Sequence, residues 1–134
     1  AVLQPMGAVT LLPGILEFRY YLNDGMAFSM LSGRQGLLIA VTSVVLLCVL
    51  AALLRRKMQL PERIAWTLIL GGGIGNLIDR VANGVVVDYI NVLFVNFAVF
   101  NFADICITSG AILLMAWVLF DSFKKESKEQ EGAR

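Results

Sequence analysis

The sequence predicts an all-α integral membrane helical bundle, with three spans in this chain and short strands at the membrane surface. Of its 134 residues, 58% are hydrophobic and 16% are charged, whereas soluble domains carry about 25% charged residues. Three long apolar runs are separated by polar connections, and the first has about the length that crosses a bilayer as a helix. We therefore expect a single membrane-embedded domain, residues 1–134, whose solvent is lipid.

The segment Val9–Tyr21 is predicted to form strands at the membrane surface. It mixes β-branched, aromatic and polar residues around a central proline–glycine turn signal. Residues 23–25 (Asn-Asp-Gly) signal a second turn. Such a turn could also offer an amide and free backbone groups to an extended peptide, but the residues alone favour the simple turn.

Two apolar runs follow and are predicted to be membrane-spanning helices. Gly36–Leu54 is uncharged and is closed by three basic residues. Ile64–Ile78 is shorter and rich in glycine, begins after a proline and a glutamate, and ends at Asp79-Arg80. Among its glycines, Gly71 and Gly75 have the small-xxx-small spacing that lets helices approach closely.

The last third of the chain combines an interfacial segment with a third helix. Val85–Phe100 is β-branched and aromatic with interspersed polar residues, which predicts strand or loop. Phe102–Phe120 is apolar except for Asp104 near its start. The charged tail, Lys124–Arg134, is predicted to be a solvated and frayed terminus in the cytoplasm.

The distribution of basic residues predicts the orientation of the bundle, because cytoplasmic loops carry an excess of lysine and arginine. The first connection and the tail are basic, whereas segments 1–35 and 79–101 carry three arginines between them. The latter segments therefore face outward, and three spans leave the N-terminus outside. No signal peptide or start methionine precedes Ala1, so we expect a further helix upstream, giving four spans with both ends inside.

Composition excludes several functional classes. The net charge of +1 gives no sign of a nucleic-acid surface. The chain has no histidine, which removes Ser-His-Asp and Cys-His catalysis and most zinc sites. Cys48 and Cys106 lie in separate apolar runs and are interpreted as buried thiols. Carboxylates are the obvious candidates for proton transfer.

Asp88 and Asp104 are the best-placed acids, because both fall on the outward side beside membrane-spanning segments, where a carboxylate is costly. Two close carboxylates share one proton, so that one can activate water while the other protonates a carbonyl oxygen. Asn101 is an N-cap three residues before Asp104, and the helix dipole favours charge there. The hypothesis is that Asp104 is ionised and Asp88 carries the proton. Taken singly, each acid is better explained as a cap or turn residue, whereas for the two together the catalytic and structural interpretations stay open.

The polar residues that follow the glycine run also leave two interpretations open. Asn76, Asp79 and Arg80 lie on one helical face at the outer membrane edge. An Asp79–Arg80 pair at a helix end is ordinary structure, whereas Asn76 with Arg80 could position a substrate. The glycines do not form a dinucleotide loop, because no strand–helix–strand unit surrounds them.

Four motif blocks, in order and spacing, resemble those of lipoprotein signal peptidase (signal peptidase II). They are Asn23-x-Gly25-x-Ala27-Phe28, Gly71-Gly72-x-x-Gly75-Asn76-x-x-Asp79-Arg80, Val86-Val87-Asp88 and Phe100-Asn101-x-Ala103-Asp104. The resemblance implies a four-helix inner-membrane aspartyl protease with a small extracytoplasmic β-cradle. Its relatives begin with a first helix carrying an Asp-x-x-x-Lys element, which this chain lacks, and this departure agrees with the topology argument.

The resemblance also implies roles for single residues. Asp88 and Asp104 correspond to the catalytic pair, and the substrate-binding positions are Asn23, Gly25, Asn76, Arg80 and Asn101, while Asp79 is structural. The implied partners are a lipid-modified prolipoprotein and membrane lipid, with no nucleic acid, and the enzyme is expected to be a monomer of the bacterial cytoplasmic (inner) membrane. No metal or organic cofactor is required, because the pair supplies both acid and base.

The residues also allow two other functions. A small proton- or cation-coupled transporter would use Asp88 and Asp104 as ion ligands along a path that crosses the bilayer. The sequence places both acids near one face instead. A non-catalytic assembly or lipid-binding protein, built on the glycine-rich face, would tolerate asparagine at both positions.

Overall fold

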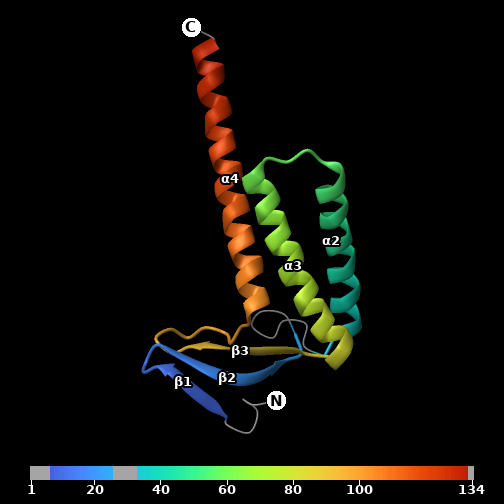
Figure 1. The fold of residues 1–134 in the computed structure, drawn as a ribbon, viewed down its shortest axis with the longest axis vertical. Coiled ribbons are helices and arrows are strands. Elements are labelled where there is room, and N and C mark those ends of the chain that lie inside the picture. The colour runs from blue at the N-terminus through green and yellow to red at the C-terminus, as the bar shows by residue number, and fades with distance from the viewer. Residues whose placement is uncertain (1–6, 26–32, 133–134) are drawn as a thin grey trace.

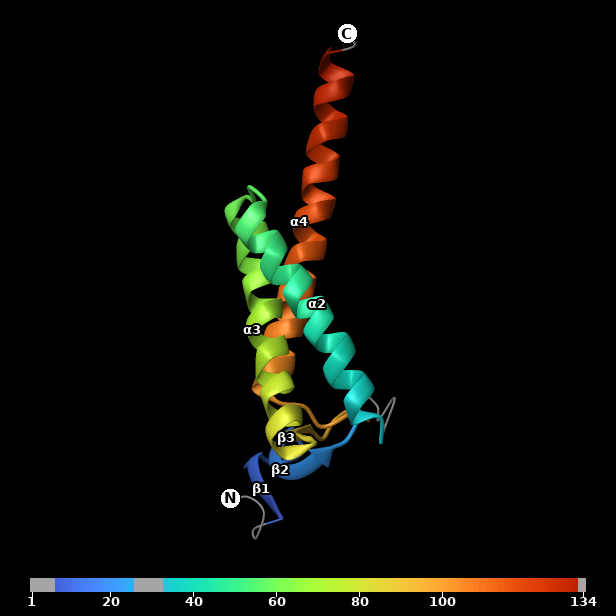
Figure 2. The same ribbon diagram turned by 90° about the vertical axis from the view of Figure 1, so that its right-hand side faces the viewer.

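The computed structural model describes residues 7–25 and 33–132, which form three helices standing on a small sheet (Figure 1). In chain order the elements are β1 (Ala8–Leu12), β2 (Leu16–Asn23), α2 (Gln35–Arg55), α3 (Leu60–Asn83), β3 (Val86–Val92) and α4 (Phe102–Gly132). Helix α3 packs against both α2 and α4. The sheet lies across one end of the helices, and α4 projects beyond the other two at the opposite end (Figures 1 and 2).

The sheet is antiparallel in the order β1-β2-β3, which confirms that the predicted segments form strands. Strands β1 and β2 form a hairpin around the predicted Pro13-Gly14 turn, where Gly14 takes a φ of 72° that favours glycine. Strand β3 joins from far along the chain and pairs with β2, with Tyr21 opposite Asp88. This pairing carries Asp88 to the end of the sheet that lies beneath the helices.

Within the described residues, two helices are long and apolar enough to cross a membrane, Gln35–Arg55 and Phe102–Lys128. Little of either helix is buried by the rest of the chain, so their exposed leucine, valine and phenylalanine side chains need an apolar solvent. Helix α3 has 24 residues but carries charges at both ends. That α3 forms the third span stays a prediction.

Glycines and alanine bring α3 and α4 into close contact. A Cβ on Gly72 would collide with the carbonyl oxygen of Ala103, and one on Gly110 would lie 2.7 Å from the carbonyl oxygen of Ala65. The predicted packing role of the glycine run is therefore correct in kind. Gly71 was the wrong choice, because it is exposed with nothing within 4 Å of a Cβ there.

The tail differs from its predicted frayed state. Helix α4 continues through the charged segment to Gly132 without a break. Lysine, glutamate and glutamine are strong helix formers, and Asp121 adds an i,i+4 ion pair with Lys125 at 2.8 Å. The high charge of this segment therefore does not prevent it from being helical.

Candidate active site

Asp88 is the third residue of β3 and is almost completely buried, with 1% of its surface exposed. Two side-chain amides donate to its carboxyl group: Asn23 from β2 to Oδ2 and Asn101 to Oδ1, both at 2.8 Å. A buried carboxyl group is costly unless it is hydrogen-bonded. The sequence surrounds this one with amides rather than with a cation in direct contact.

Asp104 lies in the first turn of α4 and forms a reciprocal cap with Asn101. The backbone N–H of Asp104 donates to Asn101 Oδ1 at 3.1 Å, and the N–H of Asn101 donates to Asp104 Oδ2 at 3.0 Å. Asn76 of α3 donates to the other carboxyl oxygen, Oδ1, at 2.8 Å. The positive end of the helix dipole therefore faces Asp104, as the sequence predicted.

Asn101 connects the two acids into one hydrogen-bond network. Its Nδ2 donates to Asp88 Oδ1 at 2.8 Å and to Asn76 Oδ1 at 3.0 Å, while Asn76 in turn donates to Asp104. Asn76 and Asn101 are both buried. The network joins β2, β3, α3 and the start of α4, so residues up to 81 positions apart in the sequence meet at one point.

Arg80 fixes the turn predicted at residues 23–25. Its guanidinium donates to the carbonyl oxygen of Gly25 at 2.7 Å and to that of Asn76 at 3.3 Å. The N–H of Gly25 donates to Asn23 Oδ1 at 2.9 Å, which is the hydrogen bond of an Asx turn. Arg80 therefore joins the turn to α3. Ala27 and Phe28, from the same motif block, lie outside the described residues.

Asp79 does not join the cluster around the two acids. Its Oδ2 accepts a hydrogen bond from the backbone N–H of Val87 at 3.4 Å, which is consistent with the structural role that the resemblance implied. The contact connects the end of α3 to the start of β3.

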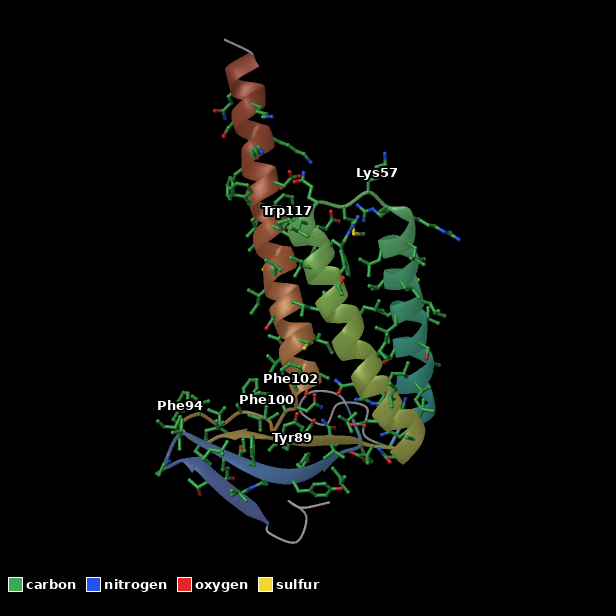
Figure 3. All side chains as sticks on the ribbon, viewed as in Figure 1. Lys57, Tyr89, Phe94, Phe100, Phe102 and Trp117 are labelled. Carbon is green, nitrogen blue, oxygen red and sulfur yellow. The ribbon has the colours of Figure 1, made fainter. Side chains whose placement is uncertain are left out.

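Sequence reasoning missed Tyr89, which holds the Asp88 strand against α4. The N–H groups of Tyr89 and Ile90 both donate to the carbonyl oxygen of Phe100, at 3.0 and 2.7 Å, as in a β-bulge. The Tyr89 hydroxyl also accepts from the N–H of Phe102 at 3.3 Å. Figure 3 shows Tyr89 on β3 beneath the end of α4. A bulge depends on how two segments pair, so the local sequence carries no signal for it.

A cavity of about 550 Å³ opens beside the network. Its walls come from both loops and helices, and the surface is mostly apolar. The predicted site residues that line it are Asp88, Asp104, Asn23, Asn76 and Arg80. Asn101 and Gly25 are not among the lining residues, but each is hydrogen-bonded to a residue that is, Asn101 to Asp88 and Gly25 to Arg80. Three hydroxyl side chains missed by sequence reasoning also line the cavity: Thr42, Thr108 and Ser109.

Burial raises the pKa of Asp88 above its ordinary value. The nearby Asp104 carboxyl group adds to this increase in pKa, because like charges disfavour each other. The amides of Asn23 and Asn101 and the charge of Arg80 act in the opposite direction, and burial outweighs them. The net direction favours a protonated Asp88.

Comparisons with known proteins show which family this chain resembles in sequence. A family model described as "Signal peptidase (SPase) II" matches residues 1–120. The lipoprotein signal peptidase of Lactococcus lactis subsp. lactis is 40% identical over 116 residues, which cover 87% of this chain and 75% of the relative. That of Trichormus variabilis is 43% identical over 106 residues, which cover 78% and 67%.

Solved structures share the fold of this chain. One described as a bacterial membrane enzyme superposes with a TM-score of 0.84 at 30% identity, covering 88% of this chain and 74% of that one. A second with the same description gives a TM-score of 0.75 at 30% identity, covering 84% and 74%. The arrangement of helices and sheet is therefore shared along most of the chain.

Proposed function

The chain belongs to the signal peptidase II family, and from this premise we propose that it is an intramembrane aspartyl endopeptidase that removes signal peptides from diacylglyceryl-modified prolipoproteins. The observation that carries the proposal is the pairing of Asp88 and Asp104 through one amide network beside a largely apolar cavity. Two acids with different surroundings can divide the roles of acid and base between them.

The proposed division gives the proton to Asp88 and the charge to Asp104. Burial raises the pKa of Asp88, while Asp104 accepts a backbone N–H at a helix N-terminus, where negative charge is favoured. Each carboxyl oxygen accepts one amide hydrogen bond in the network. An oxygen with two lone pairs can accept a second hydrogen bond, so each acid can still reach water or substrate.

The proposed reaction is direct attack by water. The water oxygen bonds to the scissile carbonyl carbon while Asp104 takes one water proton, and Asp88 gives its proton to the carbonyl oxygen. The tetrahedral diol then collapses: the C–N bond breaks, Asp104 passes its proton to the leaving amine, and Asp88 recovers a proton from a diol hydroxyl. Acid and base both come from the chain.

The cavity supports a membrane-embedded substrate. Its apolar walls, which include Leu38, Ile105 and Ile107, suit the apolar segment of a signal peptide and the acyl chains of the modified cysteine. Asn76 and Arg80 offer polar contacts at the end where the acids lie. Asn23 and Gly25 are proposed to hold the extended peptide near the cleavage point.

The proposed orientation sets the acids at the extracytoplasmic face of the bacterial inner membrane and the C-terminus in the cytoplasm. The sheet and the site lie at one end of the helices, whereas Lys57 and the rest of the α2–α3 connection lie at the other (Figures 1 and 3). The charged residues 124–132 of α4 also lie at that far end. Basic segments are retained in the cytoplasm. The proposed enzyme is a monomer.

A gel-shift cleavage assay tests the proposal. The protein in its natural full length would be incubated with a diacylglyceryl-modified prolipoprotein and, separately, with the same precursor lacking the lipid. We expect cleavage of the modified precursor, and a loss of about 10²–10⁴-fold in rate on Asp104→Asn, the usual range for removing an acid or base. Asp121→Asn, at the far end of α4, is the matched control and should cleave normally. Full activity of Asp104→Asn would refute the mechanism.

A further inference from the structure

The end of the sheet farthest from the helices is an exposed apolar tip made by two loops distant in sequence. We define this sheet tip as the exposed residues Leu11, Leu12, Ile15, Leu93, Phe94 and Val95. Phe94 is the most exposed of them, at 69%. In Figure 3, Phe94 lies at the outer end of the sheet, away from the helices. Exposed apolar clusters of this kind mark contact with a partner or a membrane.

Backbone hydrogen bonds hold the two loops of the sheet tip together in a defined arrangement. The N–H of Ile15 donates to the carbonyl oxygen of Leu12 at 3.0 Å, closing the hairpin. The N–H of Leu93 then donates to the carbonyl oxygen of Ile15 at 2.9 Å, joining the second loop to the first. Six large apolar side chains are thereby presented together at the end of three paired strands.

Charge is absent from the two segments that make the tip. Residues 7–16 and 89–103 contain no aspartate, glutamate, lysine or arginine. The nearest charged residues on β2, Arg19 and Glu17, form an ion pair with each other at 3.0 Å, so that their charges offset one another. A loop that faces water normally carries charged residues, whereas a surface that enters a bilayer interface must exclude them.

Apolar and aromatic side chains recur between the tip and the start of α4, with Asn96 as an exposed polar residue among them. Phe94, Phe100 and Phe102 follow one another from the end of the sheet to the start of that helix (Figure 3). Between them, the rings of Phe97 and Phe100 stack edge to face at 5.8 Å, and Phe102 is 65% exposed. Aromatic side chains gather in this way where a membrane protein meets the headgroup region.

From these observations we infer that the sheet tip inserts into the outer-leaflet interface of the membrane that α4 crosses, as a second membrane anchor beside the helices. The sheet lies across the end of the bundle (Figure 1), so a tip at the level of Phe102 meets the same leaflet. The anchor fixes β3, and with it Asp88, at a constant depth relative to the membrane. A protein partner would instead require the tip to remain in water until that partner binds.

Fluorescence quenching in liposomes tests the inference. The full-length protein would carry Phe94→Trp as its single tryptophan, with Trp66 and Trp117 replaced by phenylalanine. Phospholipids labelled with nitroxide near the glycerol backbone quench from within the interface, and iodide quenches from water. We expect strong lipid quenching and weak iodide quenching for Phe94→Trp. Ala8→Trp, on the exposed edge strand at the end away from the tip, should give the reverse.

A second variant protects the test against a folding failure. Leu12→Trp probes the same tip from the other loop and should give the same ratio of lipid to iodide quenching as Phe94→Trp. Iodide quenching that exceeds lipid quenching at both positions would overturn the inference. The test does not depend on peptidase activity, so its failure would leave the proposed function standing.

Discussion

The two ends of the helix bundle treat polar groups in opposite ways. At the sheet end, Asp88, Asn76 and Asn101 are buried, and the Asn101 amide donates to Asp88 at 2.8 Å and to Asn76 at 3.0 Å. At the far end the charged groups make a longer contact: Arg56, with 64% of its side chain exposed, lies 3.8 Å from Glu62, with 19% exposed. A polar group that is buried without a hydrogen-bond partner lowers the free energy of unfolding more than an exposed one does. The structure of the sheet end therefore depends on individual hydrogen bonds, whereas that of the far end depends on its charge rather than on single contacts.

The largest effect on stability is expected at Asn101. Asn101→Ser keeps an oxygen that can cap α4 but removes the amide that donates to both Asp88 and Asn76. Leaving buried acceptors without a donor costs about 1–3 kcal/mol in the free energy of unfolding, measured by thermal denaturation in detergent. Asn96→Ser, at an exposed position in the neighbouring loop, is the control. Equal melting temperatures for the two variants would mean that the network contributes no stability.

Gly72 tests whether close helix packing supports the network. Gly72→Ala would press a methyl group against the Ala103 carbonyl oxygen and within 2.8 Å of Ile107 Cγ1. Overpacking of this kind costs about 1–3 kcal/mol, and it would displace Asn76 from Asp104. Gly71→Ala adds the same methyl group to open space and should leave the melting temperature unchanged. A loss of stability from Gly71→Ala alone would invert the assigned packing face.

The pH dependence of cleavage should report the proton on Asp88. If the proton on Asp88 is needed, the alkaline side of the pH profile shows full activity at lower pH. Activity is then lost as the pH rises through the raised pKa of Asp88. The Asn23 amide favours the charged form of Asp88. Asn23→Ala should therefore raise the pKa further and move the alkaline limb of kcat/KM to higher pH, whatever happens to its height. A limb that moves to lower pH would contradict the assignment.

The smallest effect is expected at the connection between α2 and α3. Arg56→Gln removes a 3.8 Å ion pair between an Arg56 side chain that is 64% exposed and a Glu62 side chain that is 19% exposed. At this length, and with one partner in solvent, the pair is expected to contribute about 0–1 kcal/mol. Melting temperature and cleavage rate should both stay close to those of the unmodified protein. A loss as large as that of Asn101→Ser would show that the far end is also specified by single contacts.

The sequence was sufficient to predict which polar residues come together, but not how they are connected. The motif blocks named Asp88, Asp104, Asn76, Arg80 and Asn101, and the structure brings all of them together. The cap between Asn101 and Asp104 was predictable because it is local. The bond from Asn101 to Asp88 was not, because it depends on a bulge and on the pairing of strands distant in sequence.

The errors of prediction have physical causes of the same kind. Gly71 and Gly72 are adjacent, and the rotation of α3 against α4 decides which of them faces the neighbouring helix. The high charge of the tail predicts a frayed terminus, because charged segments often lack regular structure. A solvated helix needs only good helix formers and compatible neighbours, and both are present between Asp121 and Gly132.

The central claim is that Asp88 and Asp104 act as one unit, and single-turnover cleavage by three variants tests it most directly. Rates would be measured for Asp88→Asn, Asp104→Asn and the double variant, each checked for folding by its melting temperature. Residues that share one chemical task have non-additive effects, so the double variant should be about as slow as the slower single variant. Rate losses that multiply would mean that the two acids act independently, and the account of a shared proton would be wrong.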